Sequence, residues 1–151
     1  MGGQSQPGLI VSFKRIHPEA GVPEYAHDGD AGCDLRSMCD LELRPGERAI
    51  VPTGIAMSIP EGYAGFVQPR SGLAAKHGIS IVNTPGLIDS HYRGEIKAIL
   101  INTDPEASFE IKQGDKVCQL VFQKVDQALF VEVDELDETV RGSGGFGSTG
   151  V

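Results

Sequence analysis

The stretch Asn83-Thr84-Pro85-Gly86-Leu87-Ile88-Asp89-Ser90-His91-Tyr92-Arg93-Gly94-Glu95-Ile96-Lys97 decides the fold, because it joins two apolar runs through a polar loop. Residues 80–82 enter it, residues 96–101 leave it, and Pro85-Gly86 marks a turn between them. The pattern predicts two strands joined by a loop that carries a carboxylate, an aromatic hydroxyl and two cations. Such a loop on a rigid scaffold is a suitable place for a site. An ordinary hairpin with a solvated tip explains the same residues.

Outward from this stretch, short apolar runs separated by turn residues recur along the chain. The 151 residues include 20 Gly and 9 Pro, which fits one domain of many short strands better than one of long helices. We therefore predict an all-β fold, an antiparallel jelly-roll-like sandwich or barrel with one short helix. The helix is expected at residues 71–78, with Ser71 as its cap and Gly78 at its end. Further strands are expected at residues 9–16, 33–36, 49–59, 63–68, 110–112, 117–124 and 128–133.

The sequence divides into three parts. Residues 1–8 are predicted to be a disordered lead, residues 9–134 the β domain, and residues 135–151 a flexible arm. The arm holds five glycines between Gly142 and Gly150, so ordering it costs entropy. Most such tails are plain flexible termini. Arg141 and Phe146 stand out in this one, and they favour an arm that closes over a ligand.

Composition excludes several classes of function. The net charge of −8 argues against general nucleic-acid binding, which needs a basic face. No apolar stretch reaches the roughly 20 residues that cross a membrane. Three cysteines without a signal peptide or a zinc-binding pattern indicate a reducing compartment, so we expect the protein in the cytoplasm. A polyanionic ligand would then need a locally basic pocket or a metal ion.

Arg70-Ser71-Gly72 opens the predicted helix. Free backbone N–H groups at a helix start suit a phosphate, and an arginine adds a planar fork of donors. A simple cap and a surface charge explain these residues equally well. The same holds for Gln119 as a polar edge-strand residue and for Asp34 as a turn-end carboxylate that accepts from backbone N–H groups.

Five motifs together are stronger evidence of function than any one of them alone. They are Ala31-Gly32-Cys33-Asp34-Leu35, Pro69-Arg70-Ser71-Gly72-Leu73-Ala74, the stretch 83–97, Gly114-Asp115-Lys116-Val117-Cys118-Gln119-Leu120, and the arm from Arg141 to Thr149. In this order and spacing the chain closely resembles the trimeric deoxyuridine triphosphatases (dUTPases) from about residue 12 to residue 149. The resemblance implies a homotrimer with shared sites that hydrolyses dUTP to dUMP and pyrophosphate with Mg²⁺.

The resemblance also implies roles for single residues. Asp89 would deprotonate the attacking water, and Arg141 would grip the γ-phosphate. Asp34 would support the metal ion indirectly, through water. Phe146 would stack on uracil, and Tyr92 would exclude a 2′-hydroxyl. The residues implied in substrate binding are Arg70, Ser71, Gly72, Asn83, Gly86, Leu87, Ile88, Tyr92, Lys97, Gln119, Phe146, Gly147, Ser148 and Thr149.

Three rival functions fit less well. The related dCTP deaminases need a catalytic Glu in the strand after the loop, where this chain has Ile99, which cannot shuttle a proton. A non-enzymatic jelly-roll binding protein would not need Asp89 or the arginine and phenylalanine of the arm. A Walker-type phosphate loop is excluded for the Gly-rich arm, because it lacks the lysine and the strand–loop–helix context.

Overall fold

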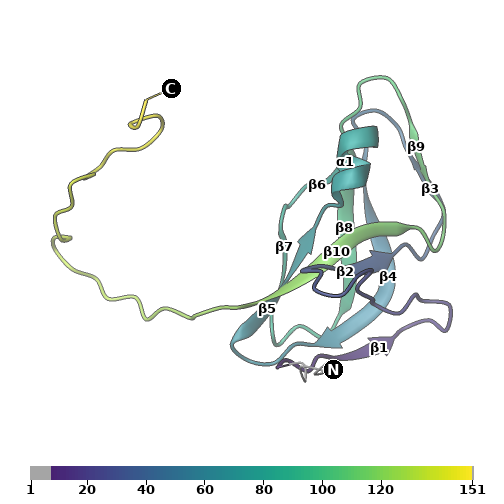
Figure 1. Ribbon diagram of the computed structural model, residues 1–151, viewed down its shortest axis with the longest axis horizontal. Helices are drawn as coiled ribbons and strands as arrows, with labels where there is room; N and C mark the ends of the chain where they lie inside the picture. Colours follow the sequence, from purple (N-terminus) through teal and green to yellow (C-terminus); the bar gives the residue numbers. More distant parts are fainter. Residues whose placement is uncertain (1–7, 151) are drawn as a thin grey trace.

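Two four-stranded antiparallel sheets form the centre of the protein, in a computed structural model that describes residues 8–150 (Figure 1). One sheet has the order β1-β4-β8-β6, the other has the order β2-β10-β5-β7, and β3 pairs with β9 in a small ladder. The elements are β1 (Ser12–Arg15), β2 (Cys33–Arg36), β3 (Leu41–Leu43), β4 (Arg48–Ser58), β5 (Tyr63–Gln68), α1 (Ser71–His77), β6 (Ile79–Ile81), β7 (Gly86–Ile88), β8 (Glu95–Asn102), β9 (Phe109–Ile111) and β10 (Lys116–Lys124). The predicted all-β, jelly-roll-like class with one short helix is confirmed.

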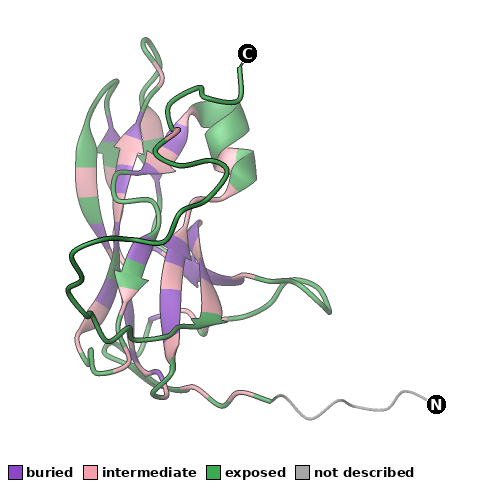
Figure 2. Cartoon of the chain, turned by 90° about the vertical axis from the view of Figure 1, so that its left-hand side faces the viewer, coloured by how far each residue is buried: buried purple, intermediate pink, exposed green. Residues whose placement is uncertain are grey.

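Aliphatic side chains fill the space between the sheets. Along β8, Ile96, Ala98 and Leu100 are buried, while the residues between them are exposed or half-buried, as expected for a strand with one face on the core. The largest fully buried side chains are all Leu, Ile or Val, which agrees with an aromatic content of 6%. Figure 2 shows the buried positions on the strands and an exposed helix and C-terminal arm. Each such side chain contributes roughly 1.5–3 kcal/mol through burial.

The connection between β6 and β8 is more than the loop that the sequence predicts. β6 and β8 are neighbours in one sheet, whereas β7, which lies between them in sequence, belongs to the other sheet. There Gly86 pairs with Val67 and Ile88 pairs with Gly65 of β5. The chain therefore crosses from one sheet to the other and back, because the free edge of β5 accepts three residues of the connection.

Two polar contacts fix the base of this connection. The register between β4 and β8 shifts within β4, and the residues at the shift bond to the start of β8. Thr53 Oγ1 donates to the carbonyl of Ile96 at 2.6 Å, and the backbone N–H of Gly54 donates to Glu95 Oε1 at 2.9 Å. Bulges of this kind bend a strand and re-aim its side chains. The base of the polar connection is thus anchored to the middle of the longest strand.

The N-cap of helix α1 is one residue earlier than predicted. The cap residue is Arg70, whose backbone is extended (φ −92°, ψ 127°) and whose side chain makes no capping hydrogen bond. Ser71 is already the first helical residue, so the prediction that Ser71 caps the helix is wrong. The predicted end is confirmed: Gly78 is left-handed at φ 65°, and its N–H donates to the carbonyl of Ala74.

After β10 the chain leaves the sandwich as an extended arm (Figure 1). Its first residue is still attached, since the N–H of Val125 donates to Gly62 O at 2.9 Å. The strand predicted at residues 128–133 is absent, because no strand of the described chain lies beside it to complete a ladder, and Phe130 is 93% exposed. The domain boundary at residues 134 and 135 stays a prediction. Of the predicted lead 1–8, residues 1–7 lie outside the described residues.

Within residues 8–150, no helix has the length and apolar character needed to cross a membrane.

Candidate active site

A polar cavity of about 290 Å³ lies where β2, β10 and the start of α1 meet. Three of the five motifs line it, although they are far apart in sequence. The lining residues are Ala26, Asp30, Ala31, Gly32, Asp34, Arg70, Ser71, Gly72 and Gln119. The structure thus brings Arg70, Ser71, Gly72, Gln119 and Asp34 together, as the resemblance implies.

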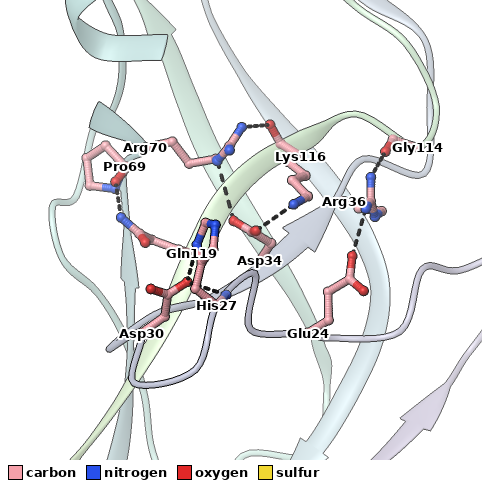
Figure 3. Close-up of polar contacts among 10 residues, drawn as sticks. All are labelled: Glu24, His27, Asp30, Asp34, Arg36, Pro69, Arg70, Gly114, Lys116 and Gln119. Carbon is pink, nitrogen blue, oxygen red and sulfur yellow. Dashed lines mark hydrogen bonds and ion pairs between the residues drawn. The ribbon is translucent and has the colours of Figure 1, made fainter. Parts of the chain in front are cut away.

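Asp34 is buried at the wall of this cavity and faces two cations (Figure 3). Arg70 Nε lies 3.4 Å from Asp34 Oδ1, and Lys116 Nζ lies 2.9 Å from Asp34 Oδ2. Arg70 also donates from Nη1 to the carbonyl of Lys116 at 3.3 Å. The alternative in which the Asp34 carboxylate accepts from backbone N–H groups is not what the structure has, because the carboxylate contacts two cationic side chains instead.

A hydrogen bond from Gln119 holds the backbone that leads into Arg70. Gln119 Nε2 donates to the carbonyl of Pro69 at 3.0 Å, as Figure 3 shows, and the Gln119 backbone is in register with Asp34 on one side and Gln68 on the other. Gly32 lies so close that a Cβ there would be 2.5 Å from Gln119 Oε1. A side chain at residue 32 would therefore require Gln119 to move, and with glycine there the Gln119 side chain is oriented before any ligand enters.

Asp89 lies in a different part of the chain, directly after β7. It is exposed, and within the described residues its carboxylate forms no ion pair or hydrogen bond. It lines a second cavity of about 610 Å³ with Glu61, His91 and Asp126 among its walls. His91 Nε2 lies 3.2 Å from Glu61 Oε1. A free carboxylate beside open space can accept a proton from a bound water.

The rest of the connection holds Tyr92 in one orientation. The Tyr92 hydroxyl donates to the carbonyl of Glu95 at 2.9 Å, and a Cβ on Gly94 would lie 2.5 Å from that hydroxyl. The ring consequently needs glycine at residue 94. Lys97 Nζ lies 3.8 Å from Glu95 Oε2, on the same strand. These contacts stiffen the connection of residues 83–97, called the hairpin below, from its base.

The remaining predicted residues of the hairpin line its outer part. Gly86 is buried, and a Cβ there would lie 3.2 Å from Val67 Cβ. Leu87 and Asn83 are exposed, and Ile88 is half-buried. The exposed backbone of a strand at a sheet edge offers donors and acceptors at fixed spacing, which suits recognition of a flat polar ring.

The arm keeps its predicted residues away from both cavities. Arg141 Nε donates to the carbonyl of Gly144 at 2.8 Å, so it bonds within the arm itself. Phe146 is fully exposed with a positive φ of 40°, and Gly147, Ser148 and Thr149 are exposed too. A single chain thus has three separate groups of candidate residues: the Arg70 cavity, the Asp89 hairpin and the arm.

Residues 8–150 offer no cage for a metal ion. Within the described residues, no three His, Cys, Asp or Glu side chains group closely enough to hold one. All three cysteines are free, and two of them, Cys33 and Cys118, are buried and precede the cavity residues Asp34 and Gln119 in sequence. Burial raises the pKa of the Cys118 thiol to about 12 and also raises the pKa of Cys33. Cys118 is a core residue.

Sequence reasoning missed one charged residue that contacts this cavity's lining, Lys116, whose Nζ lies 2.9 Å from Asp34 Oδ2. It lies in the fourth motif, yet only Gln119 of that motif was assigned a role. A lysine at the first position of a strand reads as a surface charge, and nothing in the local sequence indicates its partner on a distant strand.

Fold and cavities together define a class of protein: an antiparallel β-sandwich with a polar, arginine-bearing cavity and a free carboxylate on a separate hairpin. The dUTPase family model matches residues 18–150. A deoxyuridine 5′-triphosphate nucleotidohydrolase of Thermobifida fusca is 56% identical over 140 residues, which are 93% of this chain and 78% of that protein.

Solved structures with a similar fold are also dUTPases. A mutant dUTPase of Staphylococcus bacteriophage 80alpha with dUpNHpp has a TM-score of 0.88 and 30% identity, and the match covers 94% of this chain and 99% of that one. A mutant dUTPase from phage phi11 of S. aureus has a TM-score of 0.77 and 28% identity over 83% of this chain and 97% of that one, and is described as coordinating a structural Mg(II) ion. The chain belongs to the dUTPase family of hydrolases in nucleotide metabolism.

Proposed function

We propose that this chain hydrolyses dUTP to dUMP and pyrophosphate, which limits uracil in DNA and supplies dUMP for dTMP synthesis, in the cytoplasm. The observation that supports this most is the free carboxylate of Asp89 on a stiffened hairpin, in a chain that matches the dUTPase family over residues 18–150. The Arg70 cavity supplies the other requirement, a polar space with an arginine at the start of a helix, where a phosphate chain can bind.

In the proposed reaction Asp89 accepts a proton from a water molecule. The water oxygen forms a bond to the α-phosphorus, and the bond from that phosphorus to the α–β bridging oxygen breaks. The electron pair of the broken bond leaves with pyrophosphate. The chain contributes mainly by positioning water and phosphate and by neutralising charge, which are the principal terms in phosphoryl transfer.

The triphosphate is proposed to lie against Arg70, Ser71, Gly72 and Gln119, with Arg141 at the γ-phosphate. Mg²⁺ belongs to the substrate here, as the Mg–nucleotide complex, and when bound it neutralises phosphate charge and orients the leaving group. Asp34 would act on it only through water. The contacts of Asp34 with Lys116 and Arg70 leave this role to its remaining lone pairs.

Deoxyuridine is proposed to lie against the hairpin. The residues assigned to it are Asn83, Gly86, Leu87, Ile88, Tyr92 and Lys97. The fixed Tyr92 ring would leave no room for a 2′-hydroxyl, so UTP would be rejected sterically. Phe146 would stack on uracil when the arm closes, with Gly147, Ser148 and Thr149 adding polar contacts.

Three subunits are proposed to share each site. Arg141 and Phe146 line neither cavity of their own chain, so a complete site requires either a large movement of the arm or a neighbouring copy. In the proposed homotrimer one subunit supplies the Arg70 cavity, a second supplies Asp89, and the third supplies the arm.

Hydrolysis in ¹⁸O-labelled water tests the proposal directly. We expect pyrophosphate release from dUTP, with the label in dUMP, because the water attacks the α-phosphorus. UTP, dTTP and dCTP serve as matched control substrates and should react at least about a hundredfold more slowly. Label in pyrophosphate would refute the position of attack, and equal turnover of UTP would refute the role of Tyr92.

A further inference from the structure

Lys116 does not line the Arg70 cavity, but it contacts the cavity residue Asp34, and the proposed mechanism assigns it no part. It starts β10, its side chain is 26% exposed, and its Nζ lies 2.9 Å from the buried carboxylate of Asp34. The same carboxylate contacts Arg70 Nε at 3.4 Å through its other oxygen. Lys116, Asp34 and Arg70 therefore form a triad with one anion between two cations (Figure 3).

A bulge in β10 directs the Lys116 side chain to this position. Gln119 is in register with Asp34, and simple alternation would place Lys116 on the opposite face from Gln119. The register between β10 and β2 shifts between Lys116 and Cys118, and Val117 and Cys118 are both buried in succession. The shift places Lys116 and Asp34 in contact, which agrees with the tendency of bulges to re-aim side chains near functional sites.

The triad also fixes how Arg70 presents its guanidinium. Nε faces Asp34, and Nη1 donates to the backbone carbonyl of Lys116. In the described part of the chain, Nη2 has no hydrogen bond or ion pair, so its N–H groups remain for a ligand. A guanidinium held on two sides loses little freedom when it binds phosphate, because its plane is already set.

We propose that Lys116 is a positioning residue for phosphate binding, which acts by holding Asp34 so that Arg70 remains available to the phosphate chain. The proposal rests on the proposed function of this cavity. Charges +1, +1 and −1 leave the triad at +1, whereas removal of the Lys116 charge would leave Asp34 and Arg70 as a neutral pair. A neutral pair attracts a polyanion less, and an unshared carboxylate draws the guanidinium toward itself.

Substitution of Lys116 separates this role from simple structural support. In Lys116→Met we expect about a tenfold rise in KM for dUTP and in the Kd of Mg-pyrophosphate measured by calorimetry, with kcat changed by less than about threefold. The Kd of deoxyuridine, which has no phosphate, should stay within about twofold of wild type. Lys116→Arg keeps the charge and should restore pyrophosphate binding.

The double variant Lys116→Met with Asp34→Asn gives the most specific test of this role. Removing the carboxylate frees Arg70 again, so this double variant should bind metal-free pyrophosphate more tightly than Lys116→Met alone. Mg²⁺ is omitted from this comparison because Asp34 is proposed to act on the metal ion. Lys112→Met is the matched control, because Lys112 pairs with Glu110 on the neighbouring ladder and contacts neither Asp34 nor Arg70. It should bind pyrophosphate as wild type does.

Three results would overturn the inference. They are a parallel loss of deoxyuridine and pyrophosphate binding in Lys116→Met, a double variant that binds no better than Lys116→Met, and a wild type that binds no pyrophosphate. If Lys116→Met does not fold, Lys116→Gln allows the same comparisons with a polar, uncharged side chain. Calorimetry needs no turnover, so absence of dUTP hydrolysis by the wild type would refute the proposed function while leaving this test intact.

Discussion

Mixed assembly of two inactive variants tests whether each site is shared between chains. One variant is Asp89→Asn, which keeps the shape of the hairpin but cannot take a proton. The other is a chain cut after Val140, which lacks Arg141 and Phe146. In the described chain these two groups lie on separate parts of the molecule, the hairpin after β7 and the extended arm (Figure 1).

The expected activity follows from how the proposed trimer draws on its subunits. A site is complete when the subunit that supplies the hairpin is truncated and the subunit that supplies the arm is Asp89→Asn. With equal, random mixing each condition holds for half of the subunits, so about a quarter of all sites should be complete in a closed three-fold ring. The subunit that supplies the Arg70 cavity is intact in both variants.

The assay is dUTP hydrolysis after the two variants are unfolded together and refolded. The parents alone, and the parents mixed without unfolding, are the controls, and mass measurement confirms mixed trimers. We expect about a quarter of wild-type activity in the co-refolded sample. If Asp89 and the arm act from the same chain, no site can be complete, so mixed trimers as inactive as their parents would refute the shared site.

The remaining predictions concern single residues. Asp89→Asn should lower kcat by about two orders of magnitude or more with KM for dUTP near wild type, and near-normal turnover would remove Asp89 as the base. Phe146→Ala should weaken binding of dUpNHpp by about 1–3 kcal/mol, and amide exchange at residues 142–150 should slow when the wild type binds it; unchanged exchange would contradict a closing arm. Asn102 is fully buried, and its side chain donates two hydrogen bonds, at 2.9 and 2.8 Å, to carbonyls outside β8. Asn102→Ala should therefore lower the free energy of unfolding in urea by roughly 3 kcal/mol, and a loss below about 1 kcal/mol would show that water replaces those bonds. The pKa of Cys118 is raised to about 12 from an ordinary 9.0, so the folded state favours the neutral thiol, and the resulting stabilisation is complete below pH 9 and is lost between pH 9 and 12. Over that pH range the free energy of unfolding of the wild type should fall more steeply than that of Cys118→Ala. Parallel slopes for the two proteins would contradict the raised pKa.

Local signals in the sequence were reliable where a few neighbouring residues determine the conformation. The turn at Arg44 to Glu47 is present, with the N–H of Glu47 donating to the carbonyl of Arg44 at 3.0 Å. Gly78 ends the helix because the left-handed conformation there favours glycine. The motif around Arg70 lines a cavity together with the motifs around Asp34 and Gln119, as their resemblance to dUTPases implies.

Other features of the fold depend on neighbouring strands or side chains that cannot be identified from the local sequence. The residues of β7 read as loop, because three residues carry no periodicity and only the free edge of β5 makes them a strand. The run at residues 128–133 reads as a strand from its apolar residues, yet no strand of the described chain pairs with it. Strand formation by short segments is decided by the neighbour rather than by the segment.

The sequence by itself determined the all-β class and the short helix, because turns and glycine positions act over short distances along the chain, and the order of its five motifs indicated the family. The roles of the candidate site residues stay predictions from that resemblance. Tertiary structure alone decided that β7 crosses to the second sheet and that a bulge brings Lys116 to Asp34 and Arg70. The physical reason is that strand pairing and ion pairing join residues from distant parts of the chain, and their energies depend on geometry that exists only after the sheets have formed.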